Sequence, residues 1–405
     1  MDGILFGPDT AVAPSILYLD NAATTPLDPS IREVMRPYLE EEFGNPSSRH
    51  RLGQRAAEAI EKARAEVARA AGAKSADVVF TSGGTEANNL GVLGSARARR
   101  KHGLHVLVGP TEHPCVRESA QALVEEGFEI EFLKLTREGA LDLSHMASAL
   151  RRETVVVALM LVQNEFGSVY PVRDAARLVR ARSPRAAVHV DAVQALGKVE
   201  LSIRALDADS IAISAHKIHG PKGSGALITN GPIPLRPLVF GGGQQGARRP
   251  GTEGVAGIVG LGAAARIAEE HREEACASMR RCREILAETI LRIRGARILE
   301  PVPSAQGSSL AQTSSPAILA AVIPGAPSEV RMNHLEELGV IVSAGSACHA
   351  RASQISPALA AIGLSVEEAR CMLRFSFSRS TTETDARTAA AALEAVCRKL
   401  ESAPG

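Results

Sequence analysis

The chain has 405 residues, 45% of them hydrophobic, and a mean hydropathy close to zero, a composition typical of a globular protein with one large domain and a smaller one. Its 46 basic and 45 acidic side chains leave a net charge of +1, so charge gives no reason to expect nucleic acid or an anionic membrane as a partner. No apolar run reaches the roughly 18 residues that span a bilayer, and residues 1–14 lack the pattern of a signal peptide. We therefore expect a cytoplasmic protein. The six cysteines show no metal-binding spacing, which favours free thiols and no metal site.

Short β-branched runs alternate along the chain with longer segments rich in Ala, Glu and Arg. Strands of unalternated apolar residues separated by helices predict an α/β protein with a largely parallel sheet covered on both faces. The expected strands are residues 77–81, 105–109, 155–161, 187–191, 210–214 and 225–229. The expected helices include residues 29–41, 52–71, 86–100, 115–126, 143–151, 172–182 and 327–337.

The last third of the chain has a different pattern. From residue 255 a helical stretch is expected to run to about residue 294 and to bridge to a smaller domain. Residues 366–373 are a predicted helix that begins with a capping box, because Ser365 and Glu368 have the required spacing. The predicted strands of this part are residues 317–323 and 374–378.

Several predicted strands are followed by residues that suit a ligand site, and in an open α/β sheet ligands collect at the carboxyl ends of the strands. After the first strand, Gly83 and Gly84 let the backbone approach a ligand, and the next helix offers free N–H groups and the Thr85 hydroxyl to a phosphate. His113 follows the second strand and Asn164 the third. Each has an ordinary alternative when taken alone: a plain connection, a structural histidine or a turn-forming asparagine.

The most informative pair is Asp191 and Lys217, each of which follows a short apolar run. A carboxylate at the end of a buried strand is costly unless it is paired, although a helix N-cap would also explain it. A pyridoxal phosphate (PLP) site needs an amine for a Schiff base and a carboxylate for the pyridine nitrogen. This pair could supply both groups.

The order of the motifs resembles that of cysteine desulfurases, which are class V aminotransferase-like, fold type I PLP enzymes. The resemblance covers about residues 17 to 390. The motifs are YLDNAATTP at 18–26, GNPSS at 44–48, TSGGTEANN at 81–89, NEFG at 164–167, DAVQ at 191–194, SAHKIHGPKG at 214–223, GGGQ at 241–244, GTE at 251–253 and GSAC at 345–348.

The resemblance implies an α/β fold of PLP-dependent transferase type I, with a mainly parallel seven-stranded sheet in the large domain and a smaller C-terminal α+β domain. We predict the large domain at residues 17–262 and the small one at 263–405. Residues 1–30 are a candidate to pack on the small domain, and residues 1–16 are predicted to be a loosely held tail.

Roles follow from the resemblance position by position. Lys217 would form the Schiff base with PLP, Asp191 would pair with the pyridine nitrogen, and Gln194 would hydrogen-bond the phenolic oxygen. His113 would stack on the ring and help to move protons. The remaining cofactor-binding residues would be Gly84, Thr85, Ser214, His216 and, from the neighbouring subunit, Thr252, which implies a homodimer with shared sites.

The substrate residues implied by the resemblance are Asn164, Arg374 and Asn21, with the Arg374 guanidinium matching a carboxylate. Cys348 would carry the distinctive chemistry, since it lies in a segment of small residues whose composition favours a mobile loop. A thiolate there could take the sulfur of a PLP-bound cysteine as a persulfide and leave alanine. His349 is a candidate base and equally an ordinary surface histidine. Cys115, close to His113, has no assigned role.

Different positions of the sequence point to different substrates. The segments 249–252, 347–349, 354–357 and 374–382 are closer to selenocysteine lyases of animals, whereas Pro114 stands where those lyases carry an aspartate. We therefore predict a PLP-dependent cysteine desulfurase acting on L-cysteine, with a selenocysteine lyase acting on L-selenocysteine as the alternative. The sulfur acceptor would be a protein such as an iron–sulfur scaffold. A catalytically idle scaffold homologue is disfavoured, because Lys217, Asp191 and Cys348 are all present.

Overall fold

The computed structural model describes residues 16–300, 314–344 and 355–402. Within these ranges, no helix combines the length and the apolar character needed to cross a membrane. Cys348 and His349, the GSAC motif that contains the cysteine, and the predicted tail up to residue 15 lie outside the described residues.

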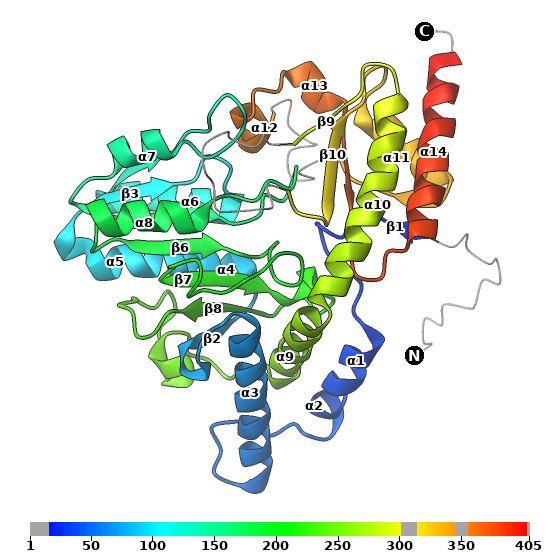
Figure 1. The fold of residues 1–405 in the computed structure, drawn as a ribbon. Coiled ribbons are helices and arrows are strands. Elements are labelled where there is room, and N and C mark those ends of the chain that lie inside the picture. Colours follow the sequence, from blue (N-terminus) through cyan, green and yellow to red (C-terminus); the bar gives the residue numbers. More distant parts are fainter. Residues whose placement is uncertain (1–15, 301–313, 345–354, 403–405) are drawn as a thin grey trace, which may run out of the picture.

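A seven-stranded sheet forms the centre of the larger part of the molecule (Figure 1). Its strand order is β2-β8-β7-β6-β5-β3-β4. The run from β7 to β4 is parallel, and β8 is antiparallel to both of its neighbours. The predicted α/β class and mainly parallel sheet are thus confirmed. The strands are β2 (Val78–Thr81), β3 (His105–Val108), β4 (Glu129–Phe132), β5 (Thr154–Met160), β6 (Ala187–Asp191), β7 (Ser210–Ser214) and β8 (Gly225–Thr229).

Helices cover both faces of this sheet, which explains why most of its strands are apolar without alternation. In β5, Val157 and Leu159 pack on one face, whereas Val156 and Ala158 pack on the other. The first face is covered by α3 (Arg51–Ala70), α7 (Leu143–Ala149), α8 (Val172–Arg182) and α9 (Val255–Glu270). The second is covered by α4 (Gly84–Asn89), α5 (Ser95–Arg99) and α6 (Pro114–Ala122).

The C-terminal part is built on a second, three-stranded antiparallel sheet of order β12-β10-β9. Its core is shared with Leu19 and Ala22 from the start of the chain. There β1 (Leu17–Tyr18) pairs in parallel with β11 (Val340–Ile341). The other elements are α10 (Arg272–Arg292), β9 (Arg297–Ile298), β10 (Ile318–Val322), α11 (Ser328–Glu337), α12 (Pro357–Ala361), α13 (Val366–Arg370), β12 (Met372–Ser376) and α14 (Glu383–Ser402). The domain boundaries given above stay a prediction.

Three expected helices are interrupted. The helix predicted at residues 29–41 divides into α1 (Pro29–Met35) and α2 (Pro37–Glu40), because Pro37 has no backbone N–H for a continuous helix. The one predicted at 86–100 begins two residues earlier, at Gly84, and contains a π-helical segment at Leu90–Gly94. The stretch from residue 255 breaks at His271, between α9 and α10.

The helix predicted at residues 366–373 is too long. Its capping box is confirmed, since Ser365 and Glu368 exchange side-chain and backbone hydrogen bonds. The helix ends at Arg370, so Cys371 follows it rather than lying within it. The strand β12 then begins at Met372, where pairing with β10 competes with the helix.

Candidate active site

The ends of three strands with the same direction, β2, β6 and β7, form the floor of the candidate site. The glycine turn after β2 lies against the other two strand ends. Gly83 has φ +152°, a value that favours glycine. A Cβ on Gly84 would lie 2.7 Å from Val193 Cγ2 and 3.5 Å from Ser214 Cβ. The glycines therefore allow α4 to begin directly beside Asp191 and Ser214.

The carboxylate of Asp191 is buried and is held by neutral donors. Asn88 Nδ2 donates to Asp191 Oδ2 (2.9 Å), and the backbone N–H of Val193 donates to Oδ1 (3.0 Å). Burial raises the pKa of Asp191, and these hydrogen bonds oppose the rise. A buried carboxylate with only neutral hydrogen-bond donors is suited to a further, cationic donor.

The side chain of Asn88 is itself oriented by His189. Its Oδ1 lies 2.9 Å from His189 Nε2, and His189 Nδ1 lies 2.9 Å from Ser210 Oγ. Burial lowers the pKa of His189 to about 3, so the ring is neutral. Because an amide oxygen only accepts, the ring proton is on Nε2 and the Asn88 amide nitrogen faces Asp191.

Lys217 lies in a short 3-10 turn, Ala215–Lys217, directly after β7. Its Nζ donates to the backbone oxygens of Ala22 and Ala23, each at 2.6 Å. Burial, together with the charge of Arg374, lowers the pKa of Lys217 to about 8, whereas Asp191 and Asp20 oppose the shift. An amine with a depressed pKa is the form needed for a nucleophile or a base near neutral pH.

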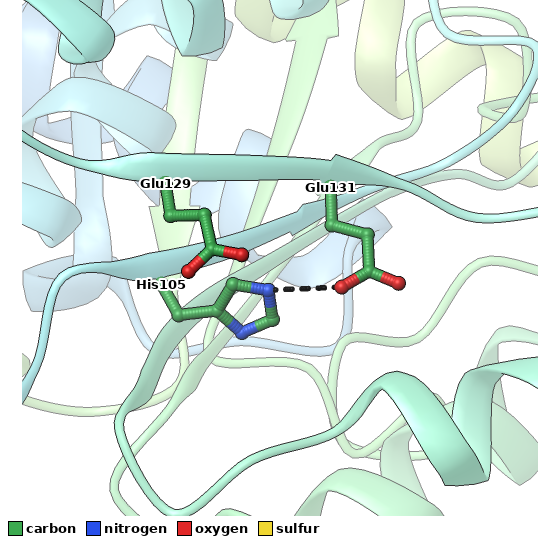
Figure 2. Close-up of side chains that lie close together, drawn as sticks. All are labelled: His105, Glu129 and Glu131. Atoms are coloured by element: carbon green, nitrogen blue, oxygen red, sulfur yellow. Dashed lines mark ion pairs between the residues drawn. The ribbon is translucent and has the colours of Figure 1, made fainter.

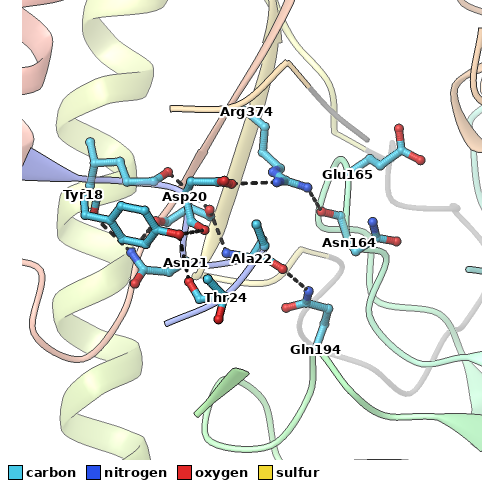
Figure 3. Close-up of polar contacts among 12 residues, drawn as sticks. Tyr18, Asp20, Asn21, Ala22, Thr24, Asn164, Glu165, Gln194 and Arg374 are labelled. Atoms are coloured by element: carbon cyan, nitrogen blue, oxygen red, sulfur yellow. Dashed lines mark hydrogen bonds and ion pairs between the residues drawn. The ribbon is translucent and has the colours of Figure 1, made fainter. Parts of the chain in front are cut away.

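The Gln194 carboxamide lies beside this amine. Its Nε2 donates to Ala22 O (2.8 Å), the oxygen that Lys217 also contacts, and its Oε1 accepts from Lys198 Nζ (2.8 Å). Figure 3 shows the contact between Gln194 and Ala22. The donor end of Gln194 therefore lies next to the Lys217 amine.

His113 caps the N-terminus of α6. Its Nδ1 accepts from the backbone N–H of Cys115 (3.2 Å) and lies 3.0 Å from Cys115 Sγ. Burial lowers the pKa of His113, while Asp191 raises it and Lys217 lowers it. The ring is thus neutral near pH 7, with its proton on Nε2. Burial also raises the pKa of Cys115 to about 12, so its thiol stays protonated.

Arg374, on β12, reaches the site from the C-terminal part. Its Nη2 donates to Asp20 Oδ1 (2.7 Å) and its Nη1 donates to Asn164 O (2.8 Å), as Figure 3 shows. The Arg374 side chain is only 4% exposed, so Asp20 supplies the counter-charge that its burial requires. Asn164 contacts Arg374 through its backbone and not through its amide.

Of the other predicted site residues, His216 and Asn21 make hydrogen-bond contacts within the chain, whereas Thr85 and Thr252 are exposed. His216 Nδ1 lies 3.1 Å from Thr24 Oγ1, and Asn21 Nδ2 donates to Ser376 O (2.8 Å), so Asn21 fastens the first strand to β12. Thr85 and Thr252 are both solvent-exposed in this single chain. The residues that the sequence patterns missed are Asp20, Asn88 and Lys198. Asp20 and Asn88 lie within quoted motifs, and Lys198 lies four residues after Gln194.

One group in the described part of the chain could offer three metal ligands. His105, Glu129 and Glu131 have ligand atoms within 4.8 Å of one another (Figure 2). Arg151 already pairs with both carboxylates, at 2.6 Å from Glu129 Oε2 and 3.2 Å from Glu131 Oε2. His105 and Glu129 begin β3 and β4, so they lie at the amino ends of the strands. Lys217 instead follows the carboxyl end of β7. We explain the group as an ion-pair cluster around Arg151.

The family model described as "Aminotransferase class-V" matches residues 17–388, and the mainly parallel sheet with a buried carboxylate and a lysine at adjacent strand ends is consistent with that match. Two similar curated proteins are the cysteine desulfurase IscS of Dictyoglomus turgidum, 37% identical over 391 residues and 95% of each chain, and the putative cysteine desulfurase IscS 1 of Bacillus subtilis, 36% identical over 95% of this chain and 99% of that one.

Solved structures agree with these relatives. A NifS-like protein has a TM-score of 0.85 and 32% identity, covering 95% of this chain and 99% of that one. The structure of SspA in complex with cysteine has a TM-score of 0.75 and 30% identity, covering 89% and 99%. This chain belongs to the cysteine desulfurase family, and that membership implies PLP as its cofactor.

Proposed function

We propose that this chain is a PLP-dependent enzyme that converts L-cysteine to L-alanine and takes the sulfur on Cys348 as a persulfide. The observation that carries the proposal is the placement of the Lys217 amine and the buried Asp191 carboxylate at the ends of the neighbouring strands β7 and β6. The relative solved with bound cysteine supports this substrate.

The residues at the site fit the cofactor. Asp191 has two neutral hydrogen-bond donors and would take the protonated pyridine nitrogen as a third. Gln194 presents its Nε2 next to Lys217, as a donor to the phenolic oxygen would. Thr85, Ser214 and His216 would hold the phosphate, beside the glycine turn where a Cβ on Gly84 would lie 2.7 Å from Val193 Cγ2. When bound, PLP withdraws electrons from the α-carbon of the substrate.

The side chains of this chain then divide the work. Arg374 would bind the substrate carboxylate with its guanidinium, and Asp20 would share that cation with the substrate. Lys217, whose pKa is lowered by burial to about 8, would take the α-proton on Nζ. His113 would hold or deliver a proton at Nε2. The Cys348 thiolate would form an S–S bond to the substrate sulfur as the carbon–sulfur bond breaks, and a proton on the carbon completes alanine.

The assembly that we propose is a cytoplasmic homodimer. Thr252 is exposed on the loop before α9, which supports its reaching the phosphate of a neighbouring subunit. Large apolar side chains on the surface also support a partner, since Phe43 is 75% and Phe240 is 83% exposed. A turnover cycle needs an acceptor that removes the persulfide sulfur, and we propose an iron–sulfur scaffold protein for that role.

The test is alanine formation from L-cysteine and, separately, from L-selenocysteine. We expect Lys217→Ala to lose at least about a hundredfold in rate, whereas the matched control Lys222→Ala, an exposed lysine in the same segment, keeps its rate. Cys348→Ala should lose activity on cysteine, and Cys371→Ala should not.

Three results would contradict parts of the proposal. Full activity in Lys217→Ala would remove the amine from the mechanism. Full activity on cysteine in Cys348→Ala would remove the persulfide step. Strong activity on selenocysteine with little on cysteine would make the protein a selenocysteine lyase.

A further inference from the structure

A buried lysine that the proposed mechanism does not use lies directly behind the site. Lys198 is 6% exposed. Its backbone is held in place, because its N–H donates to Ala195 O (3.0 Å) and its oxygen accepts from Cys276 Sγ (3.1 Å). In the described part of the chain, its Nζ makes one hydrogen bond, to Gln194 Oε1 (2.8 Å).

Among the described residues, no negatively charged group compensates for the burial of this amine. Burial, together with the positive charges of Lys217 and Arg374, lowers the pKa of Lys198 to about 7. A cavity of about 30 Å³ beside Lys198 is lined by further basic side chains. No carboxylate of the described ranges contributes to the shift in the pKa of Lys198. The titratable and charged groups that face it are Lys217, Arg374, His216, His219, His271 and Arg379, the last of which is paired with Asp28. An unpaired buried amine destabilises the fold, so its one hydrogen bond is the feature to explain.

That hydrogen bond decides which end of Gln194 faces Lys217. The two ends of a carboxamide have the same shape and opposite hydrogen-bonding character. Lys198 holds the oxygen end, so the NH₂ end points to Ala22 O, where it lies next to Lys217 Nζ. Without Lys198, the buried Oε1 would lose its donor, and an amide rotation or shift would become the way to satisfy it.

We propose that Lys198 is a positioning residue, which holds Gln194 Oε1 so that the carboxamide offers its NH₂ group to the phenolic oxygen of the cofactor. The inference rests on the proposed function. It names a residue outside the set that would touch cofactor or substrate, acting through Gln194.

The consequence is a shift in the spectrum of the bound cofactor. A donor to the phenolic oxygen stabilises its anionic form, so the visible chromophore loses its proton at a lower pH. Loss of a hydrogen bond to a charged group should therefore raise the pKa of the chromophore, by about one pH unit.

The experiment is a pH titration of the visible absorption of the holoenzyme without substrate. We expect Lys198→Met to raise the chromophore pKa by about one unit and Gln194→Leu by at least as much. The double variant should match Gln194→Leu alone, because Lys198 acts through that side chain. Lys222→Met, which removes an exposed lysine near His216, should shift the pKa by less than about 0.3 unit.

Each other outcome overturns the proposal. No shift in Lys198→Met would show that the hydrogen bond is unimportant, and additive shifts would show that the lysine charge acts on the chromophore directly. If Lys198→Met is insoluble, Lys198→Leu removes the same donor in a shorter side chain. A wild-type protein without a visible band that depends on Lys217 would overturn both this inference and the proposed function, whereas a normal band with unmoved variants overturns this inference alone.

Discussion

The orientation of Asp191 depends on Asn88. The amide of Asn88 donates to Asp191 Oδ2 (2.9 Å) and to Cys115 Sγ (3.3 Å), and its oxygen faces His189. Because Cys115 also contacts His113, this single amide links the carboxylate beneath the ring position to the histidine that would stack on the ring. The Nε2–H of His189, which donates to Asn88 Oδ1, keeps the amide from turning.

Cys115 should be an unreactive thiol despite its place in the site. Burial raises its pKa to about 12, and the thiolate is the reactive form. We expect iodoacetamide at pH 8 to alkylate Cys115 at least about tenfold more slowly in the native protein than in urea, measured by mass spectrometry of the peptide.

Cys371 is the internal control for this labelling. It is partly exposed at the end of α13, so it should be alkylated in the native protein under the same conditions. Equal labelling of Cys115 in native and unfolded protein would show that its thiol is accessible and acidic.

The helical run from α4 to α5 is locked to β6 by a glycine. The π-helical segment Leu90–Gly94 is buried throughout, and a Cβ on Gly91 would lie 2.2 Å from His189 Cε1. The helix therefore crosses β6 at the point where His189 supports Asn88. This is a close approach that only glycine permits.

We expect Gly91→Ala to lower the free energy of unfolding by about 1–3 kcal/mol, because His189 must move and overpacking is costly. Urea unfolding of the apoprotein measures it. The matched control is Gly257→Ala in α9, where the new Cβ would lie 3.7 Å from Ser224 Cβ and better helix propensity should stabilise by up to about 1 kcal/mol. Equal effects at the two glycines would contradict the packing argument.

The two parts of the molecule meet through the start of the chain. Leu19 and Ala22 pack in the C-terminal core, while the backbone oxygens of Ala22 and Ala23 accept from Lys217 in the large sheet. The ion pair between Asp20 and Arg374 (2.7 Å) fastens the start of the chain to β12 of the C-terminal part. A movement of the C-terminal part would therefore change the hydrogen bonds of the Lys217 amine.

The buried lysines give the whole apoprotein a characteristic pH dependence. The pKa of Lys198 is lowered by burial to about 7 and that of Lys217 to about 8, both from 10.5. Above pH 7 the unfolded chain therefore binds more protons than the native protein, so the free energy of unfolding should rise as the pH increases toward about 10.

This rise is checked by urea unfolding of apoprotein at pH 6.5 to 9. The wild type should gain stability across this range, and Lys198→Met should gain less, because one of the two protons that folding displaces is gone. Parallel curves for the two proteins would show that Lys198 has an ordinary pKa in the fold.

Local pattern was enough for the elements that are buried by their own composition. The bounds of β6, β7, β8 and α8 agree with the sequence prediction, because an apolar run or a helical period is written in consecutive residues. The candidate residues at the strand ends could be predicted in the same way, because the carboxyl ends of parallel strands lie on the same side of the sheet. The capping box at Ser365 was likewise readable from a spacing of three residues.

Contacts between distant segments required the tertiary structure. The partly exposed edge strand β4 and the two-residue β1 carry too little apolar pattern to be recognised, and the helix before Cys371 ends early because Met372 pairs with β10. Asp20 meets Arg374 across 354 residues of sequence, and Gln194 Nε2 meets the backbone oxygen of Ala22 across 172 residues. Residue type and spacing thus determine which groups are present at the strand ends, whereas their partners, pKa values and hydrogen-bonding direction arise from burial and packing, which no local pattern encodes.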